Sequence, residues 1–127
     1  MTVEDRSAFE RSERITMLTD FVLALVATAL AVPLLLRHGM SGDPAILCWA
    51  LAFLSTAVAA AVGGIFHGTR LYVSAATADR LWQATVLLTI PVSLCLLLAG
   101  AFTVPAGGIR AAVIALAAMK ALIVLLL

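Results

Sequence analysis

Residues 45–66, "AILCWALAFLSTAVAAAVGGIF", form an apolar segment without a single charged side chain. A helix needs about 20 predominantly apolar residues to cross roughly 30 Å of bilayer hydrocarbon, and this segment has that length. Segments of similar character occur at residues 15–36, 81–102 and 109–127. The sequence therefore predicts an all-α integral membrane protein in which residues 15–127 form one domain, a four-transmembrane-helix bundle.

The composition agrees with this class. Of the 127 residues, 64% are hydrophobic and 12% are charged, whereas soluble domains are nearer half apolar and a quarter charged. The apolar residues also fall in long blocks and lack the alternation typical of a membrane β-barrel. The net charge of +1, with no basic patch, gives no sign of nucleic acid as a partner. The expected partner is the lipid bilayer.

The distribution of arginines predicts the orientation, because cytoplasmic loops of membrane proteins are enriched in positive charge. Residues 1–14 are expected to form a cytoplasmic N-terminal segment in which Glu10 and Arg14 pair at i,i+4 spacing. Its four acidic residues argue against a cleaved signal peptide. With the N-terminus in the cytoplasm, two arginines are expected outside the cell, Arg37 and Arg110. Five are expected on the cytoplasmic side: Arg6, Arg11, Arg14, Arg70 and Arg80. Both termini are therefore predicted to be cytoplasmic.

Three polar segments separate the expected spans: "RHGMSGDP" (37–44), "HGTRLYVSAATADR" (67–80) and "TVPAGG" (103–108). Their Gly, Pro and charged residues are typical of loops. The last span ends in "ALIVLLL" with no polar tail, which has the character of a chain that stops short.

Small residues dominate the second half of the segment at 45–66. Ala59 and Gly63, and Ala60 and Gly64, form two small-xxx-small pairs, the pattern that lets helix backbones approach closely in lipid. We expect this helix at the centre of the bundle, and a homo-oligomer assembled through faces of this kind. Two further small residues, Cys48 and Cys95, have no CxxC spacing and are interpreted as packing residues, with an interhelix disulfide as the alternative.

Two charged residues lie inside the expected spans, where each costs about 2.5–3.5 kcal/mol on insertion scales. Asp20 has three readings: contact with headgroup water, pairing with His67 or Arg80, or service as a proton or cation carrier. For Lys120, the long side chain either reaches toward an interface or forms a salt bridge with a carboxylate. Asp20 and Lys120 are therefore the candidates for an intramembrane ion pair or proton site.

Hydroxyl groups follow one face of the third span, at Thr85, Thr89 and Ser93, around Pro91. Because proline removes one backbone hydrogen bond of its helix, a hydroxyl of this stripe can compensate the carbonyl group that is left over. The stripe can equally line a polar cavity. Both interpretations remain open from the sequence.

His67 and Asp79 flank the second loop, so they lie at one side of the membrane. Imidazole and carboxylate groups are ordinary ligands of zinc, which needs at least three protein ligands in its sites. His38 is expected at the opposite side, so a further ligand would have to come from elsewhere, such as Asp20 or a second subunit. His67, Asp79 and Asp20 are therefore the candidate zinc site, with interfacial polar residues as the alternative.

The stretches "GGIFHGTRL" (63–71) and "ADRLW" (78–82) resemble the signature of the alkaline ceramidase-like membrane hydrolases, a superfamily that includes the adiponectin-receptor-like proteins. The first span, "TDFVLALVATALAVP", is similar to their first core helix, with Asp20 and Phe21 at the acidic and aromatic positions. The residues that match the signature are Phe66, His67, Thr69, Leu71, Asp79, Leu81 and Trp82. The resemblance implies a zinc ion that activates water against a lipid amide, with His67 and Asp79 among its ligands.

The chain departs from that superfamily at two points. Gly63 stands where the family has a serine, and the late HxxxH pair is absent, since the family has seven helices. The pattern also resembles small bacterial membrane proteins without known chemistry. We therefore expect a multi-pass protein of a bacterial inner membrane that is a partial or degenerate relative of the zinc hydrolases.

Two other functions remain as alternatives. One is a small oligomeric proton-coupled transporter that uses Asp20, because small multidrug transporters share the four-helix length and a lone acid in the first helix. Only Phe21 supplies an aromatic ring in that span. The other is a non-catalytic membrane assembly subunit.

Overall fold

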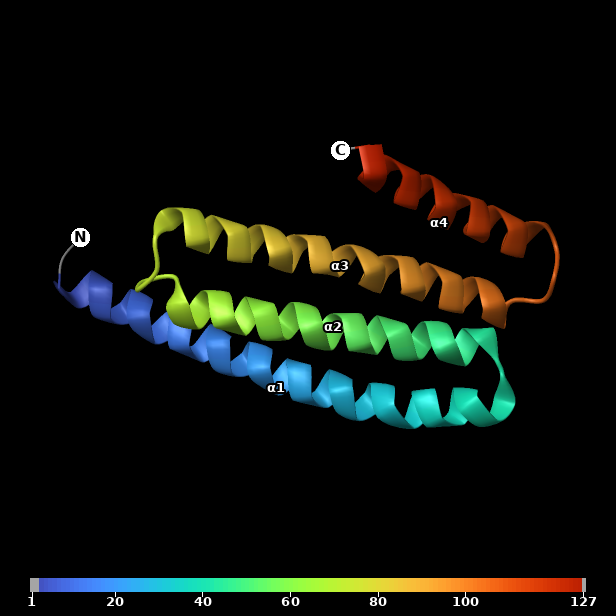
Figure 1. The fold of residues 1–127 in the computed structure, drawn as a ribbon, viewed down its shortest axis with the longest axis horizontal. Helices are drawn as coiled ribbons and strands as arrows, with labels where there is room; N and C mark the ends of the chain where they lie inside the picture. Colours follow the sequence, from blue (N-terminus) through green and yellow to red (C-terminus); the bar gives the residue numbers. More distant parts are fainter. Residues whose placement is uncertain (1–2, 127) are drawn as a thin grey trace.

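The computed structural model describes residues 3–126, which form four α-helices joined by short connections (Figure 1). The helices are α1 (Val3–Ser41), α2 (Pro44–Thr69), α3 (Ala75–Thr103) and α4 (Gly108–Leu126). By length and composition, α1, α2 and α3 can each cross a membrane. The prediction of an all-α membrane protein is thus confirmed at this level, with three candidate spans among the described residues.

The outward side chains of these helices are strongly apolar. Large hydrophobic residues of α1 are exposed along the whole apolar segment, and Leu25 reaches 71% exposure. Soluble monomers rarely expose continuous apolar surface of this extent. An apolar surface of this kind is suited to contact with lipid.

The helices lie side by side in chain order, and neighbours run antiparallel (Figure 1). α2 packs on both α1 and α3 and separates them, while α4 packs on α3 alone. The N-terminus lies at the same end as the connection between α2 and α3 (Figure 1). Among the described residues the arrangement is an open row of helices, and the bundle of four spans stays a prediction.

The central position of α2 follows from its small residues. Most of its buried positions are alanine or glycine, and no large side chain is fully buried among the described residues. A Cβ atom added at Gly64 would lie 3.2 Å from two ring atoms of Phe21 and 3.3 Å from the backbone oxygen of Met17. Glycine at this position therefore lets α1 and α2 approach closely, as expected for helices packed in lipid.

The first connection is shorter than the expected loop at 37–44. α1 continues to Ser41, and only Gly42 and Asp43 lie between the helices. Gly42 adopts a φ of +67°, and its N–H donates to the carbonyl of His38 at 2.7 Å, which ends α1. The carboxylate of Asp43 accepts a hydrogen bond from the N–H of Ala45 at 2.8 Å and caps α2, whose first residue is Pro44.

The second connection is also shorter than the segment 67–80 that the sequence marks as a loop. α2 continues to Thr69, and α3 begins at Ala75, where the side chain of Ser74 accepts from the N–H of Thr77. The error has one cause: apolar character ends at the membrane surface, whereas the helical backbone ends at a cap. His67 consequently lies on α2.

The N-terminal segment is helical and continuous with the first span, because α1 runs from Val3 to Ser41 without a break. Pro33 lies inside α1 and Pro91 inside α3, and neither ends its helix. The residues assigned to the cytoplasmic segment 1–14 therefore extend a single long helix beyond the apolar region, apart from residues 1–2, which lie outside the described part of the chain.

We expect Gly64→Ala to destabilise the protein, because the added methyl group meets the Phe21 ring and the α1 backbone. Overpacking of this kind costs roughly 1–3 kcal/mol. Gly100→Ala is the matched control: Gly100 also lies in a helix, and nothing is within 4 Å of its added Cβ. The control should be neutral or more stable by up to about 1 kcal/mol. Thermal unfolding in detergent, followed by circular dichroism, measures both, and equal midpoints would contradict the close packing.

Candidate functional site

One carboxylate is buried at the end of the molecule that holds the N-terminus. Glu13 of α1 is 8% exposed and is the buried charged residue among those described. Its Oε2 atom lies 3.0 Å from His67 Nδ1, and its Oε1 atom accepts from Arg70 Nη1 at 3.3 Å. We call Glu13, His67 and Arg70 the Glu13 cluster. It joins α1 to the end of α2.

Aromatic rings contact the cluster at Arg70 and His67. The guanidinium carbon of Arg70 lies 5.3 Å from the ring centre of Phe9 and 5.1 Å from that of Phe66, within the range of cation–π attraction. Phe66 also contacts His67 edge to face at 5.0 Å and Trp82 of α3 at 5.5 Å. The rings cover part of the Arg70 guanidinium, whose side chain remains 36% exposed.

Glu13 is the residue that sequence reasoning missed. Its sequence signal is the i,i+4 spacing from Phe9, which places both side chains on the same face of α1. The expected partner of Glu10 was Arg14, but the structure pairs Glu10 with Arg6 at 3.2 Å, one helical turn earlier and largely exposed. The N-terminal segment thus has one solvated face and one face packed on α2.

A cavity of about 390 Å³ lies between α1, α2 and α3; we call it the central cavity. Asp20 lines it, and its Oδ2 atom is 3.1 Å from the position that a Cβ atom of Gly63 would occupy. The absence of a side chain at Gly63 therefore makes room for the carboxylate. The polar residues that line the cavity are Asp20, Thr56, His67, Thr85, Thr89 and Ser93.

Asp20 forms no hydrogen bond or ion pair with any residue that the structure describes. The pairing with His67 or Arg80 that the sequence suggests is therefore not formed: His67 is engaged with Glu13. The nearby hydroxyls of Thr16 and Thr19 donate to backbone carbonyls of α1 and leave the carboxylate unbound. A carboxylate with no counter-charge in an apolar helix is an indication of function.

The hydroxyls of the α3 stripe line the central cavity, as one of the two interpretations expects. Thr85, Thr89 and Ser93 each donate to a carbonyl of their own helix, at 3.0, 2.7 and 2.9 Å, and all three line the central cavity. The acceptors are the carbonyls of residues 81, 86 and 90. The carbonyl that Pro91 leaves without a donor is that of residue 87, so the stripe does not compensate it.

Lys120 reaches α3 from α4. Its ammonium group donates to the hydroxyl of Ser93, which is the contact found in place of the carboxylate suggested by the sequence. Thr85 is beside Asp20 at Gly63, and Ser93 follows Thr85 by eight residues, about 12 Å along the helix. The ion pair between Asp20 and Lys120 is therefore not formed.

The candidate zinc ligands do not come together. His67 uses its Nδ1 for Glu13, Asp20 lines the central cavity, and Asp79 lines another cavity of about 550 Å³ with His67, Arg70 and Trp82. Within the part of the chain that the structure describes, no three His, Cys, Asp or Glu side chains are grouped to hold a metal ion. The residues present thus do not fit the zinc site of the hydrolases.

The other candidates occupy separate places. His38 lies at the far end of α1, where its Nδ1 is 2.9 Å from the carbonyl oxygen of Asp43. Cys48 and Cys95 are both free thiols, in agreement with their interpretation as packing residues.

Comparison with known families covers most of the molecule. One family profile matches residues 15–127, from the start of the long apolar part of α1 through α4. The chain belongs to DUF6962, a family of unknown function. No curated protein and no solved structure matches the chain. Membership of DUF6962 does not link the chain to the ceramidase-like hydrolases. The matched region includes Asp20, His67 and Lys120 and begins just after Glu13.

We expect Glu13→Gln to destabilise the protein by about 1–3 kcal/mol, because it removes the charged acceptor that the half-buried His67 ring and Arg70 share. Glu10→Gln is the matched control. Its pair with Arg6 is exposed, and exposed pairs contribute less than about 1 kcal/mol. Thermal midpoints in detergent compare the two variants. A Glu13 variant as stable as the Glu10 variant would show that the Glu13 cluster does not hold α1 to α2.

Proposed function

We propose that this protein is a proton-coupled transporter of small polar cations, with Asp20 as the group that binds a proton and the cation in turn. The unpaired carboxylate of Asp20 in the central cavity is the observation that supports this. An ionised side chain without a partner is costly in a membrane segment, and binding of a proton or a cation relieves that cost.

The lining of the central cavity favours hydrophilic cations. The hydroxyl groups of Thr56, Thr85 and Thr89 line the cavity together with Asp20, whereas the Ser93 hydroxyl already accepts from the ammonium group of Lys120. Each hydroxyl oxygen has lone pairs that accept hydrogen bonds from N–H groups. Among the described residues, no Phe, Tyr or Trp side chain lines the cavity, although such rings are the usual partners of bulky quaternary cations. A small cation that carries N–H donors therefore fits this lining better than a flat aromatic one.

The exchange step balances without any other reactant. The neutral Asp20 carboxyl group releases its proton as the cation arrives, and the carboxylate then holds the cation through charge and hydrogen bonds. When the cation leaves, a proton from the opposite side restores the neutral group. One proton therefore moves against one monovalent cation, and the exchange is electrically neutral.

The proposed setting is a cell membrane, in particular a bacterial inner membrane, with both termini cytoplasmic. The arginine distribution supports this orientation, which requires α4 to be the fourth span. α4 packs on α3 alone, and its exposed apolar residues include Leu116, Leu122 and Ile123. A second copy of the chain that covers these residues would complete the bundle as a homo-oligomer.

Asp20→Asn should abolish the uptake of guanidinium into liposomes that contain the protein and have an acidic interior. Guanidinium suits the test because it is small, carries N–H donors and stays charged at neutral pH. Asp43→Asn is the control, since asparagine caps a helix as well as aspartate does and Asp43 lies at the other end of the molecule. Radiolabelled guanidinium measures the uptake.

Two results would contradict the proposal. Uptake by Asp20→Asn at the wild-type rate would exclude Asp20 as the carrier, and a folded wild-type protein without uptake would favour the assembly-subunit alternative. Metal content, measured by mass spectrometry, tests the hydrolase alternative. Near-stoichiometric zinc that is lost in His67→Ala would support a zinc site, and assays of lipid-amide hydrolysis would follow.

A further inference from the structure

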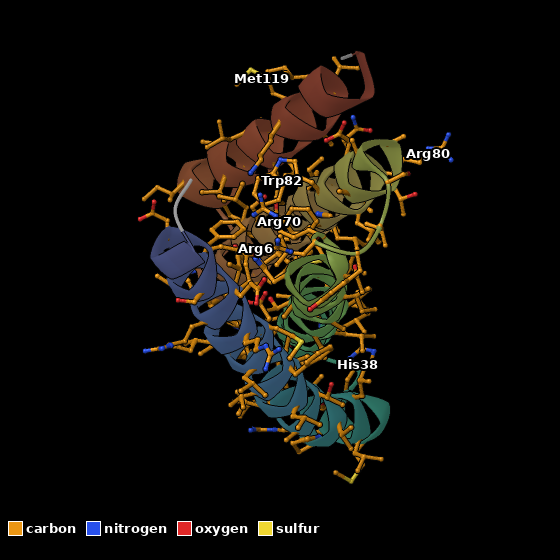
Figure 2. The ribbon with its side chains drawn as sticks, turned by 90° about the vertical axis from the view of Figure 1, so that its left-hand side faces the viewer. Arg6, His38, Arg70, Arg80, Trp82 and Met119 are labelled. Atoms are coloured by element: carbon orange, nitrogen blue, oxygen red, sulfur yellow. The ribbon has the colours of Figure 1, made fainter. Side chains whose placement is uncertain are left out.

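His67 lines three cavities. It lies about one helical turn before Arg70, which is labelled in Figure 2. The central cavity contains Asp20. A second cavity, of about 310 Å³, lies against the N-terminal part of α1 and includes Glu13 and Tyr72. The third, of about 550 Å³, lies beside the connection between α2 and α3 and includes Asp79. Among the residues that line these cavities, His67 alone belongs to all three.

The Glu13 cluster determines which ring nitrogen of His67 is available. Glu13 Oε2 lies 3.0 Å from Nδ1, and an ionised carboxylate only accepts hydrogen bonds. Nδ1 is therefore assigned as the protonated nitrogen of the neutral ring, which leaves the lone pair on Nε2. Arg70 donates to the other carboxylate oxygen and keeps Glu13 in place. The ring is thus held with Nε2 free to accept a proton.

The distance from His67 to Asp20 is short along the helix. The Asp20 carboxylate lies against Gly63, and His67 follows Gly63 by four residues, about 6 Å along the same face of α2. Water within the central cavity can bridge such a gap, since its volume of about 390 Å³ exceeds the roughly 30 Å³ that one water molecule occupies in the liquid.

We propose that His67 transfers protons between Asp20 and the water at the end of the helix row that holds the N-terminus. This inference rests on the proposed function. The Asp20 carboxyl group gives its proton through water to His67 Nε2, and the imidazolium formed is balanced by the Glu13 carboxylate. Nε2 then releases the proton to water in one of the two outer cavities, and the neutral ring is restored. The reverse sequence reloads Asp20.

The charged groups around His67 come from all three packed helices. The groups that line its cavities or contact it are Glu10, Glu13, Arg14 and Asp20 of α1, Arg70 of α2 and Asp79 of α3. Because Glu13 alone is within hydrogen-bond distance of the ring, it fixes the ring orientation, and the others affect proton transfer through their charge.

Two transport modes separate this role from a structural one. Exchange of labelled for unlabelled guanidinium across the liposome membrane needs no net proton movement, whereas uptake driven by a pH gradient does. We expect His67→Gln to lower gradient-driven uptake at least tenfold and to leave guanidinium exchange unchanged. Asp20→Asn should abolish both modes. His38→Gln should alter neither, because His38 lies at the opposite end of α1.

A second measurement does not depend on folding of the His67 variant. The chain has two histidines, so the His38→Gln protein retains only His67. Acylation of this histidine with diethyl pyrocarbonate in already reconstituted protein should block gradient-driven uptake and spare exchange.

The outcomes distinguish the two proposals. If exchange and gradient-driven uptake both survive in His67→Gln and after acylation, the role of His67 is wrong while Asp20 remains the carrier. If both modes are lost in a His67 variant that folds, His67 binds the cation and the proton-transfer role is overturned. If the wild-type protein shows neither mode, the proposed transport function itself fails.

Discussion

The close approach of α1 to α2 is the constraint on which the rest of the structure depends. Glycines of α2 face α1 at Gly63, Gly64 and Gly68, where added Cβ atoms would meet Asp20, Phe21 and Met17. Lipid supplies no hydrophobic force between helices, so contact of this kind depends on small residues. The approach brings the Asp20 carboxylate over Gly63 and places Glu13 within reach of His67 and Arg70. Without it, neither the central cavity nor the Glu13 cluster would exist.

The two polar features differ in a way that bears on function. The carboxylate of Glu13 is buried and satisfied by two donors, and a charge bound in this manner has a structural role. Asp20 has a cavity and no partner among the described residues, and such a group is available to a ligand. His67 contacts both regions, since one ring nitrogen is bonded to Glu13 and the ring lines the cavity of Asp20. The polar residues near one end of the row thus divide into the Glu13 cluster, whose carboxylate has its partners, and Asp20, which is available to a ligand.

The all-helical fold and its long apolar helices could be predicted from the sequence, because they follow from apolar length, and the cost of a charge in lipid is what singles out Asp20 as a candidate. The helix ends could not be predicted, since Asp43 and Ser74 determine them through caps that lie beyond the apolar segments. Glu13 could not be found either: its burial depends on contact with His67, which is distant in sequence. The candidate zinc ligands could not be checked from the sequence either. Spacing along the chain does not show that Asp20 and Asp79 line different cavities.

The continuity of α1 has a mechanical consequence. Glu13 and Asp20 lie on one unbroken helix, about 10 Å apart along its axis. A rigid movement of this helix therefore displaces both residues together. A force that lifts the N-terminal segment away from α2 also shifts Asp20 relative to Gly63. Whatever touches the first turns of α1, whether a headgroup, another protein or a change of charge, therefore acts on the carboxylate inside the membrane without entering it.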